Sequence, residues 1–182
     1  PLVSDVYLVP GKRTPFVKAG GLYAEHDAIA ASKPVVQAMA QRARADFLIW
    51  GQVIPSATVS NLGRELLLEV SLDPTIPAFS SVLACSTSMV AAIVAAGMLG
   101  GGGNHLALVG GVETMSHVPI ALTAPAARRL MAHFTKSPQD ALATLGSLTQ
   151  GDFSLPIRGW ANRISGRSMG EVIAHVLRDP LR

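Results

Sequence analysis

The only cysteine of the chain, Cys85, is the side chain with the clearest capacity for chemistry. It follows an apolar stretch at residues 77–84 that is typical of a buried strand, and it precedes an Ala-rich stretch at residues 86–99 that is typical of a helix. A thiol at the start of a helix faces backbone N–H groups without partners, and their field favours the nucleophilic thiolate. Cys85 is therefore a candidate nucleophile, although free cysteines also serve as small core residues.

Metal and phosphate sites are not indicated. No histidines or cysteines are paired at the spacing of metal ligands, so the sequence predicts no metal. Four successive glycines at residues 100–103 could bind a phosphate through their backbone N–H groups, but this run follows a predicted helix and precedes a predicted strand. That order is the reverse of the order in a dinucleotide-binding loop. We interpret the run as the end of the helix.

Composition restricts the classes of function. The chain of 182 residues is 49% hydrophobic and 15% charged, which allows a large core. Aromatic residues are only 5%, which is poor material for a base-stacking surface, so no nucleic acid is expected as a partner. A single cysteine excludes an intramolecular disulfide and fits a reducing compartment. The net charge is −1 for residues 1–119 and +4 for residues 120–182. The basic residues either form a patch that binds phosphate-bearing ligands or a membrane surface, or they are an ordinary solvated surface.

The hydrophobic pattern alternates between strands and helices as far as Pro119. It predicts strands at residues 6–9, 47–50, 77–84 and 105–112, and helices at residues 27–44, 61–70 and 86–99. Such alternation implies parallel strands with crossover helices, hence a three-layer α/β domain. Residues 120–167 contain no strand-like run and indicate an inserted helical or irregular excursion, with one helix at 126–134. A further helix begins at Ser168.

Membrane and export signals are absent from the pattern. The longest apolar stretch, residues 82–99, is interrupted by the polar run from Cys85 to Ser88, so it predicts a strand, a turn and a helix and not a membrane span. The chain begins with Pro1, and no charged segment followed by an apolar one suggests a signal peptide.

Four motifs in order resemble those of the thiolase family. They are RTPF at residues 13–16, VLACSTSMVA at 82–91, GGVETMS at 110–116 and SMGE at 168–171. The resemblance covers nearly the whole chain, which corresponds to the amino-terminal half of a thiolase. It implies a mostly parallel three-layer core at residues 1–119, a loop domain at 120–167 that covers coenzyme A, and a helix at 168–182 that returns to the core.

The resemblance also implies an activity. Thiolases are acyltransferases of fatty-acid β-oxidation that cleave 3-ketoacyl-CoA with coenzyme A, or run the reverse Claisen condensation. Cys85 would carry the acyl group as a thioester, and Met115 would line the acyl or pantetheine pocket. Coenzyme A would be a substrate, with no tightly bound cofactor. His26, His105, His133 and His175 lie outside the family's motifs, so we expect surface or structural roles for them.

Partners and location follow from the same resemblance. The segment His117-Val118-Pro119 looks most like the long-chain, trifunctional-complex type, in which the loop domain contacts membrane or a partner subunit. We expect a homo-oligomer, or a complex with a β-oxidation partner subunit, and peripheral membrane contact is an open alternative. The expected location is the bacterial cytoplasm or the mitochondrial matrix.

Two departures from the family pattern keep alternatives open. Thr87 and Ser88 stand where thiolases usually have Ser and Gly, and the segment also resembles the nucleophile turn of ketoacyl synthases. The histidine, the Asn-containing loop and the second cysteine of the family's carboxy-terminal half are not in this chain. The alternatives are a ketoacyl synthase-like condensing domain and a non-catalytic thiolase-like fragment.

Overall fold

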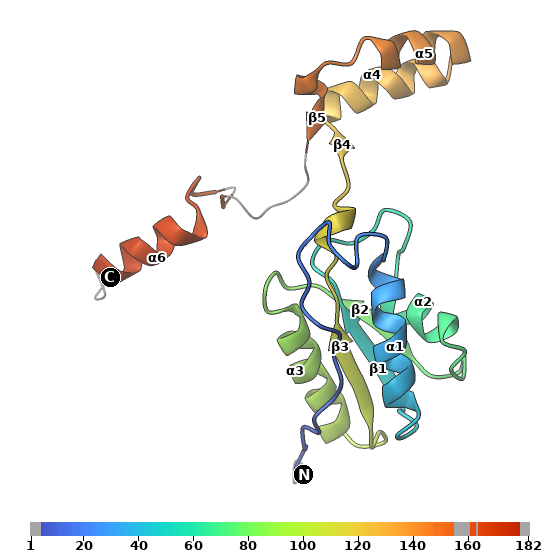
Figure 1. The fold of residues 1–182 in the computed structure, drawn as a ribbon, viewed down its shortest axis with the longest axis vertical. Coiled ribbons are helices and arrows are strands. Elements are labelled where there is room, and N and C mark those ends of the chain that lie inside the picture. Colours follow the sequence, from blue (N-terminus) through green and yellow to red (C-terminus); the bar gives the residue numbers. More distant parts are fainter. Residues whose placement is uncertain (1–4, 155–160, 163, 179–182) are drawn as a thin grey trace. The chain divides into compact units, whose positions relative to one another are not determined.

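The computed structural model describes residues 5–154, 161–162 and 164–178. The chain forms two compact units, Pro1–His117 and Val118–Arg182 (Figure 1). Within the described ranges, no helix is both long enough and apolar enough to cross a membrane.

The first unit is built on a parallel sheet of three strands. These are β1 (Phe47–Gly51), β2 (Ala78–Ser81) and β3 (Ala107–Gly111), in the order β2-β1-β3. Gly51, the last residue of β1, is in register with Ser81 of β2 and with Gly111 of β3. The three strands therefore end together, and the loops that follow them meet at one edge of the sheet.

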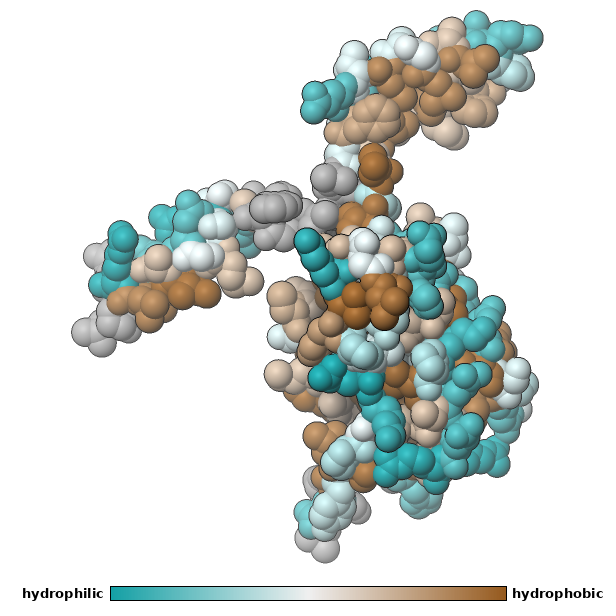
Figure 2. Space-filling model, in the orientation of Figure 1, coloured by the Kyte–Doolittle hydropathy of each residue, from teal (hydrophilic) through white to brown (hydrophobic). Residues whose placement is uncertain are grey.

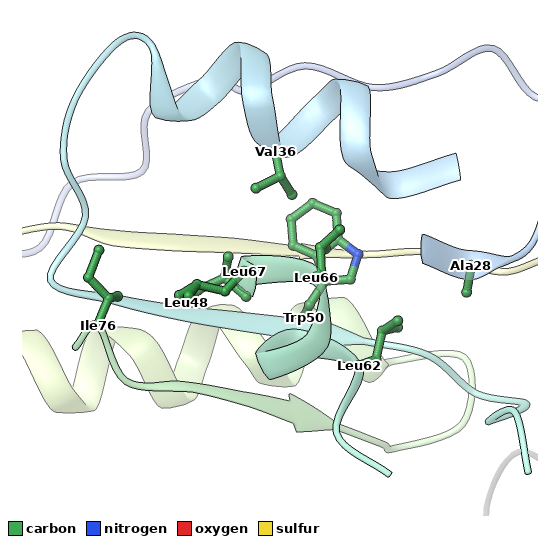
Figure 3. Packing of buried hydrophobic residues seen from close by; sticks show 8 residues of the cluster. All are labelled: Ala28, Val36, Leu48, Trp50, Leu62, Leu66, Leu67 and Ile76. Carbon is green, nitrogen blue, oxygen red and sulfur yellow. The ribbon is translucent and has the colours of Figure 1, made fainter. Parts of the chain in front are cut away.

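Helices cover both faces of this sheet (Figure 1). The helices α1 (Ala28–Ala40) and α2 (Leu62–Glu69) share a core with Leu48 and Trp50 of β1, and Figure 3 shows this packing. On the other face, α3 (Thr87–Gly100) packs against the alternate residues of β1, Phe47 and Ile49. Successive side chains of a strand point to opposite faces, so β1 is buried on both sides. The predicted three-layer α/β architecture is confirmed.

Local capping sets where two of the helices begin. The carboxylate of Asp27 accepts a hydrogen bond from the N–H of Ala30 at 2.7 Å, and the side chain of Asn61 accepts one from Arg64 at 3.1 Å. Each contact satisfies one of the free donors in a first helical turn. The predicted helices at 27–44 and 61–70 form, although the first ends at Ala40.

The second unit contains a small antiparallel pair and a helical hairpin. The strands β4 (Ala121–Leu122) and β5 (Phe153–Ser154) pair with each other, and the helices α4 (Ala124–Phe134) and α5 (Pro138–Gly146) lie between them in sequence and pack together. A further helix, α6, spans Met169–Arg178. Short 3₁₀ turns occur at Met115–His117 and Gln150–Asp152.

Three element predictions need correction. The strand predicted at residues 6–9 does not form: Tyr7 is 81% exposed and Leu8 is 90% exposed, because no described strand pairs with this segment. The strand predicted at 77–84 stops at Ser81, before a turn. The pattern also missed α5 and the strands β4 and β5 of the second unit. The two strands have only two residues each, too few to show a period.

Candidate active site

Cys85 lies in a tight turn between β2 and α3 that backbone and side-chain hydrogen bonds hold closed. The N–H of Ser86 donates to the carbonyl of Leu83 at 3.0 Å. The buried Thr87 hydroxyl donates to the carbonyl of Ala84 at 2.7 Å and accepts from the N–H of Leu83 at 2.8 Å. The turn is thereby fixed on both sides of Cys85, and the cysteine itself is exposed.

The residue before the cysteine has a strained backbone. Ala84 has a φ of 43°, in the left-handed region that costs a residue with a Cβ about 1–2 kcal/mol. Strain of this kind persists only where the surrounding structure imposes it, and it gathers at functional sites. Here the two hydrogen bonds of Thr87 impose it, and the result is a sharp corner that leaves Cys85 outside the sheet.

Two glycines make room for the start of α3. A Cβ on Gly51 would collide with the Thr87 methyl group, and a Cβ on Gly111 would collide with the Ser88 hydroxyl. The first turn of α3 therefore lies directly against the carboxyl ends of β1 and β3. Gly111 belongs to the GGVETMS motif that the sequence identified, whereas the role of Gly51 was missed. Its only signal was a glycine directly after a buried apolar run.

The polar side chains of the GGVETMS segment hold two other loops. The Glu113 carboxylate accepts from the N–H groups of Val53 and Ile54 at 3.0 and 3.1 Å, in the loop after β1. The Ser116 hydroxyl accepts from the N–H of Gly20 at 2.9 Å, in the long loop that carries RTPF. The GGVETMS segment therefore ties the loop after β1 and the loop after the RTPF motif to the end of β3.

The remaining predicted residue, Met115, lies in the 3₁₀ turn after β3 and is 48% exposed. Its contact with a substrate stays a prediction. In the RTPF loop, the Arg13 guanidinium stacks 4.6 Å from the centre of the Phe16 ring. Among the described residues, no hydrogen bond reaches the Cys85 sulfur, and no group of three His, Cys, Asp or Glu could hold a metal ion.

A cavity of about 250 Å³ lies elsewhere in the first unit. Its lining includes Leu48, Ile76 and Leu108, which stand near the amino ends of the strands, whereas Cys85 follows the carboxyl end of β2. Its walls are mostly Ala and Leu, with the Arg44–Asp73 ion pair of 2.6 Å at the wall. The cavity is therefore separate from the candidate nucleophile.

The family of the chain follows from comparison with known proteins. The model of the thiolase amino-terminal domain matches residues 6–152, which include the turn of Cys85 and the GGVETMS segment. The chain belongs to the thiolase family.

Individual relatives agree with this assignment. The chain is 30% identical over 172 residues to a probable 3-ketoacyl-CoA thiolase of Caenorhabditis elegans, covering 91% of this chain and 38% of that protein. It is 32% identical over 125 residues to the mitochondrial trifunctional enzyme subunit beta of Bos taurus, covering 66% of this chain and 26% of that protein.

Solved structures share the fold. The acetyl-CoA acetyltransferase of Bacillus anthracis superposes with a TM-score of 0.69 at 22% identity, over 90% of this chain and 39% of that one. The Acat5 thiolase of Ascaris suum, solved with coenzyme A, gives 0.71 at 18% identity, over 92% and 41%. The chain spans about 40% of the length of these two structures and of the Caenorhabditis elegans thiolase.

Proposed function

We propose that the protein is a thiolase that transfers an acyl group between 3-ketoacyl-CoA and coenzyme A through Cys85. The observation that carries the proposal is the exposed cysteine, held by a strained turn at the edge where the loops after β1, β2 and β3 meet. This turn falls inside the region that matches the thiolase domain. The similarity to proteins named 3-ketoacyl-CoA thiolase supports the substrate class.

The chemistry requires two transfers. The Cys85 thiolate attacks the 3-keto carbon and forms a C–S bond, and the bond between carbons 2 and 3 breaks. The electron pair of that bond leaves on acetyl-CoA as an enolate, which takes up a proton. The thiolate of a second coenzyme A then attacks the acyl-Cys85 thioester, forms the shortened acyl-CoA and frees Cys85. The reverse sequence is a Claisen condensation.

Substrate contacts are assigned by resemblance. By resemblance, Met115 lines the acyl or pantetheine pocket and residues 120–167 form the loop domain that covers coenzyme A. The expected bounds 120–167 and 168–182 include residues 155–160, 163 and 179–182, which lie outside the described part of the structure. The +4 charge of residues 120–182 supports an approach of the coenzyme A phosphates to this part of the chain. Coenzyme A is a substrate in this account, and no tightly bound cofactor is needed for the steps above.

The setting of the reaction is proposed from the relatives. Some of them are bacterial thiolases and one is a mitochondrial trifunctional enzyme subunit, so we place the reaction in fatty-acid β-oxidation, in the bacterial cytoplasm or the mitochondrial matrix. The protein acts as a homo-oligomer or beside a β-oxidation partner subunit. In this proposal the basic residues of the loop domain also meet a membrane surface.

Thiolysis is tested on the protein that carries this chain. Coenzyme A-dependent loss of a 3-ketoacyl-CoA is followed for the wild type and for Cys85→Ala, with acetoacetyl-CoA and a long-chain 3-ketoacyl-CoA as substrates. The proposal expects turnover that Cys85→Ala abolishes. Turnover only with substrates on a carrier protein would favour a ketoacyl synthase-like enzyme. No turnover with either class would leave a non-catalytic relative of thiolases.

A further inference from the structure

Glu113 follows the carboxyl end of β3, and its carboxylate accepts hydrogen bonds from backbone groups of another loop. One carboxylate oxygen, Oε2, accepts from the N–H of Val53 at 3.0 Å and from the N–H of Ile54 at 3.1 Å. The other, Oε1, lies 3.3 Å from the N–H of Thr114. No cation pairs with Glu113 within the described part of the chain. Two consecutive N–H groups that point to one oxygen form a specific anchor and not a chance surface contact.

The loop that Glu113 anchors follows Gly51, the residue on which the first turn of α3 packs. We call Gly51 the seat of α3. Residues 53 and 54 follow Gly51, against which the Thr87 methyl group packs. The carbonyl of Gly51 accepts from the N–H of Val112 at 2.9 Å, which is the last contact in the ladder between β1 and β3. Glu113 is the residue after Val112. Its carboxylate therefore continues the attachment between the segments of β1 and β3 beyond the end of the sheet.

The same seat supports the turn of Cys85. Thr87, which packs on Gly51, also makes the two side-chain hydrogen bonds of the turn, on either side of Ala84, whose φ is positive. A shift of the chain at Gly51 would therefore move Thr87, and through it the position of Cys85. The path from Glu113 to the thiol therefore runs through the loop after β1, Gly51 and Thr87, each in contact with the next.

We propose that Glu113 is a positioning residue for the nucleophile: it fixes the loop after β1, so that the seat of α3 and the turn of Cys85 keep one geometry. The inference rests on the proposed function, because it assigns Glu113 a part in acyl transfer. Glu113 does not touch the reacting atoms in this account. Its contribution is preorganisation, which catalysis by a nucleophile depends on.

The hydrogen-bonding pattern predicts which substitutions preserve this role. Gln keeps an oxygen at the position of Oε2, so Glu113→Gln retains the acceptor while it removes the charge. Asp keeps the charge but is shorter by one methylene, so Glu113→Asp withdraws the acceptor. Ala removes both. Glu69→Ala is the matched control, because Glu69 is an exposed residue of α2 that pairs with Lys33 at 2.9 Å and takes no part in the site.

Two measurements on the full chain test the proposal. The first is hydrogen–deuterium exchange at residues 52–55 and 82–88, which requires no activity. The second is the rate at which acetyl-CoA acylates Cys85, read by mass spectrometry. We expect Glu113→Ala and Glu113→Asp to raise exchange in both segments and to slow acylation roughly tenfold or more, with Glu113→Gln and Glu69→Ala close to wild type.

Several results would overturn the inference. One is faster exchange at residues 52–55 with no change at 82–88, which would make the anchor purely local. Another is a Glu113→Gln variant as slow as Glu113→Ala, which would assign the effect to charge. If Glu113→Ala fails to fold, the contrast between the Gln and Asp variants decides alone. If no variant, wild type included, is acylated in this chain or in a longer protein that contains it, the proposed function fails. If exchange at 82–88 still follows the expected order, the part of the inference that stands is that Glu113 fixes the turn of Cys85.

Discussion

At the scale of single residues, the position of Cys85 is set by its neighbours. Ala84 has a left-handed backbone conformation, and two hydrogen bonds of the Thr87 side chain offset its conformational strain and close the turn. The thiol is held outside the sheet as a consequence, at the start of a helix whose first N–H groups favour an anion.

The glycine beneath Ser88 gives a prediction at this scale. In Gly111→Ala the new Cβ meets the Ser88 hydroxyl, which has to turn away, and it comes within 3.1 Å of the Gly51 carbonyl, which has to give way slightly. We expect a loss of about 1–3 kcal/mol in the free energy of unfolding, as for other overpacked sites. Urea denaturation measures it.

The control for this substitution lies in α3 itself. Gly97 of α3 has open space where a Cβ would stand, so Gly97→Ala should stabilise the chain by about 0.5–1 kcal/mol through helix propensity. Equal effects of the two substitutions would show that α3 is not seated on Gly111.

Foresight at the residue scale was good for motifs and poor for long-range contacts. The sequence indicated Cys85 and the GGVETMS segment, because a residue type and its spacing are visible there. It could not indicate the positive φ of Ala84, since alanine is not a residue that turns select. It also could not indicate the contact of Glu113 with Val53, which lies 60 residues away along the chain.

At the scale of elements, one buried polar contact joins α1 to the sheet. The indole N–H of Trp50 donates to the Ser32 hydroxyl at 2.9 Å, and that hydroxyl donates to the Ala28 carbonyl at 2.7 Å. Trp50 is 3% exposed and Ser32 is 2% exposed, so water cannot replace either partner. The contact fixes the register of α1 over β1, next to the apolar core of Figure 3.

Ser32→Ala should therefore leave the Trp50 N–H buried without an acceptor. We expect a loss of about 1–3 kcal/mol in the free energy of unfolding, measured by urea denaturation. In a Trp50→Phe background the same substitution should cost clearly less, because no donor is left unpaired. Additive effects of the two substitutions would contradict the coupling.

Asp152, the last residue of the 3₁₀ turn in the second unit, gives the stability a pH dependence. The backbone N–H of Thr149, the Arg129 side chain and the Thr149 hydroxyl lower the pKa of Asp152 from 3.8 to about 2. Because the pKa is lower in the folded state than in the unfolded chain, the carboxylate contributes stability above about pH 4. This contribution is lost as the pH falls toward 2.

Asp152→Asn tests this, since asparagine does not titrate. The difference in melting temperature between wild type and Asp152→Asn should be full at pH 5 and should disappear near pH 2, measured by circular dichroism at each pH. A difference that stays constant from pH 5 to pH 2 would show that the charge of Asp152 does not stabilise the fold.

Elements with a clear period were predictable and the others were not. The strand at Phe47–Gly51 was visible because burial on both faces leaves an unbroken apolar run. The helix at Thr87–Gly100 was visible as a long Ala-rich apolar run that ends in glycines. The two-residue strands β4 and β5 have no period to detect. The segment at residues 6–9 has the composition of a strand, yet pairing requires a neighbour that its own sequence cannot specify.

At the scale of the molecule, the apolar surface is the main feature. The helix α3 is apolar all round, and Met89 and Ile93 are 66% and 63% exposed on the side away from the sheet. Figure 2 shows apolar surface on the helices of the second unit as well. A helix that is apolar on every side is typical of a buried layer. The chain spans about 40% of the length of the Caenorhabditis elegans thiolase.

We therefore expect the 182-residue chain to associate through α3. Sedimentation velocity should show species larger than a monomer, and the pair Met89→Lys with Ile93→Lys should reduce them. Leu68→Lys is the control, because Leu68 is a half-exposed apolar residue of α2. A monodisperse monomer with a cooperative melting transition would contradict the expectation.

Acylation of Cys85 is the central claim, and mass spectrometry after incubation with acetyl-CoA or a longer acyl-CoA tests it most directly. The account predicts one acyl group per chain, mapped to Cys85 and absent from Cys85→Ala. An adduct seen only on a longer protein that contains this chain would show that residues outside it generate the thiolate. No adduct on either protein, with Cys85 intact, would contradict the account.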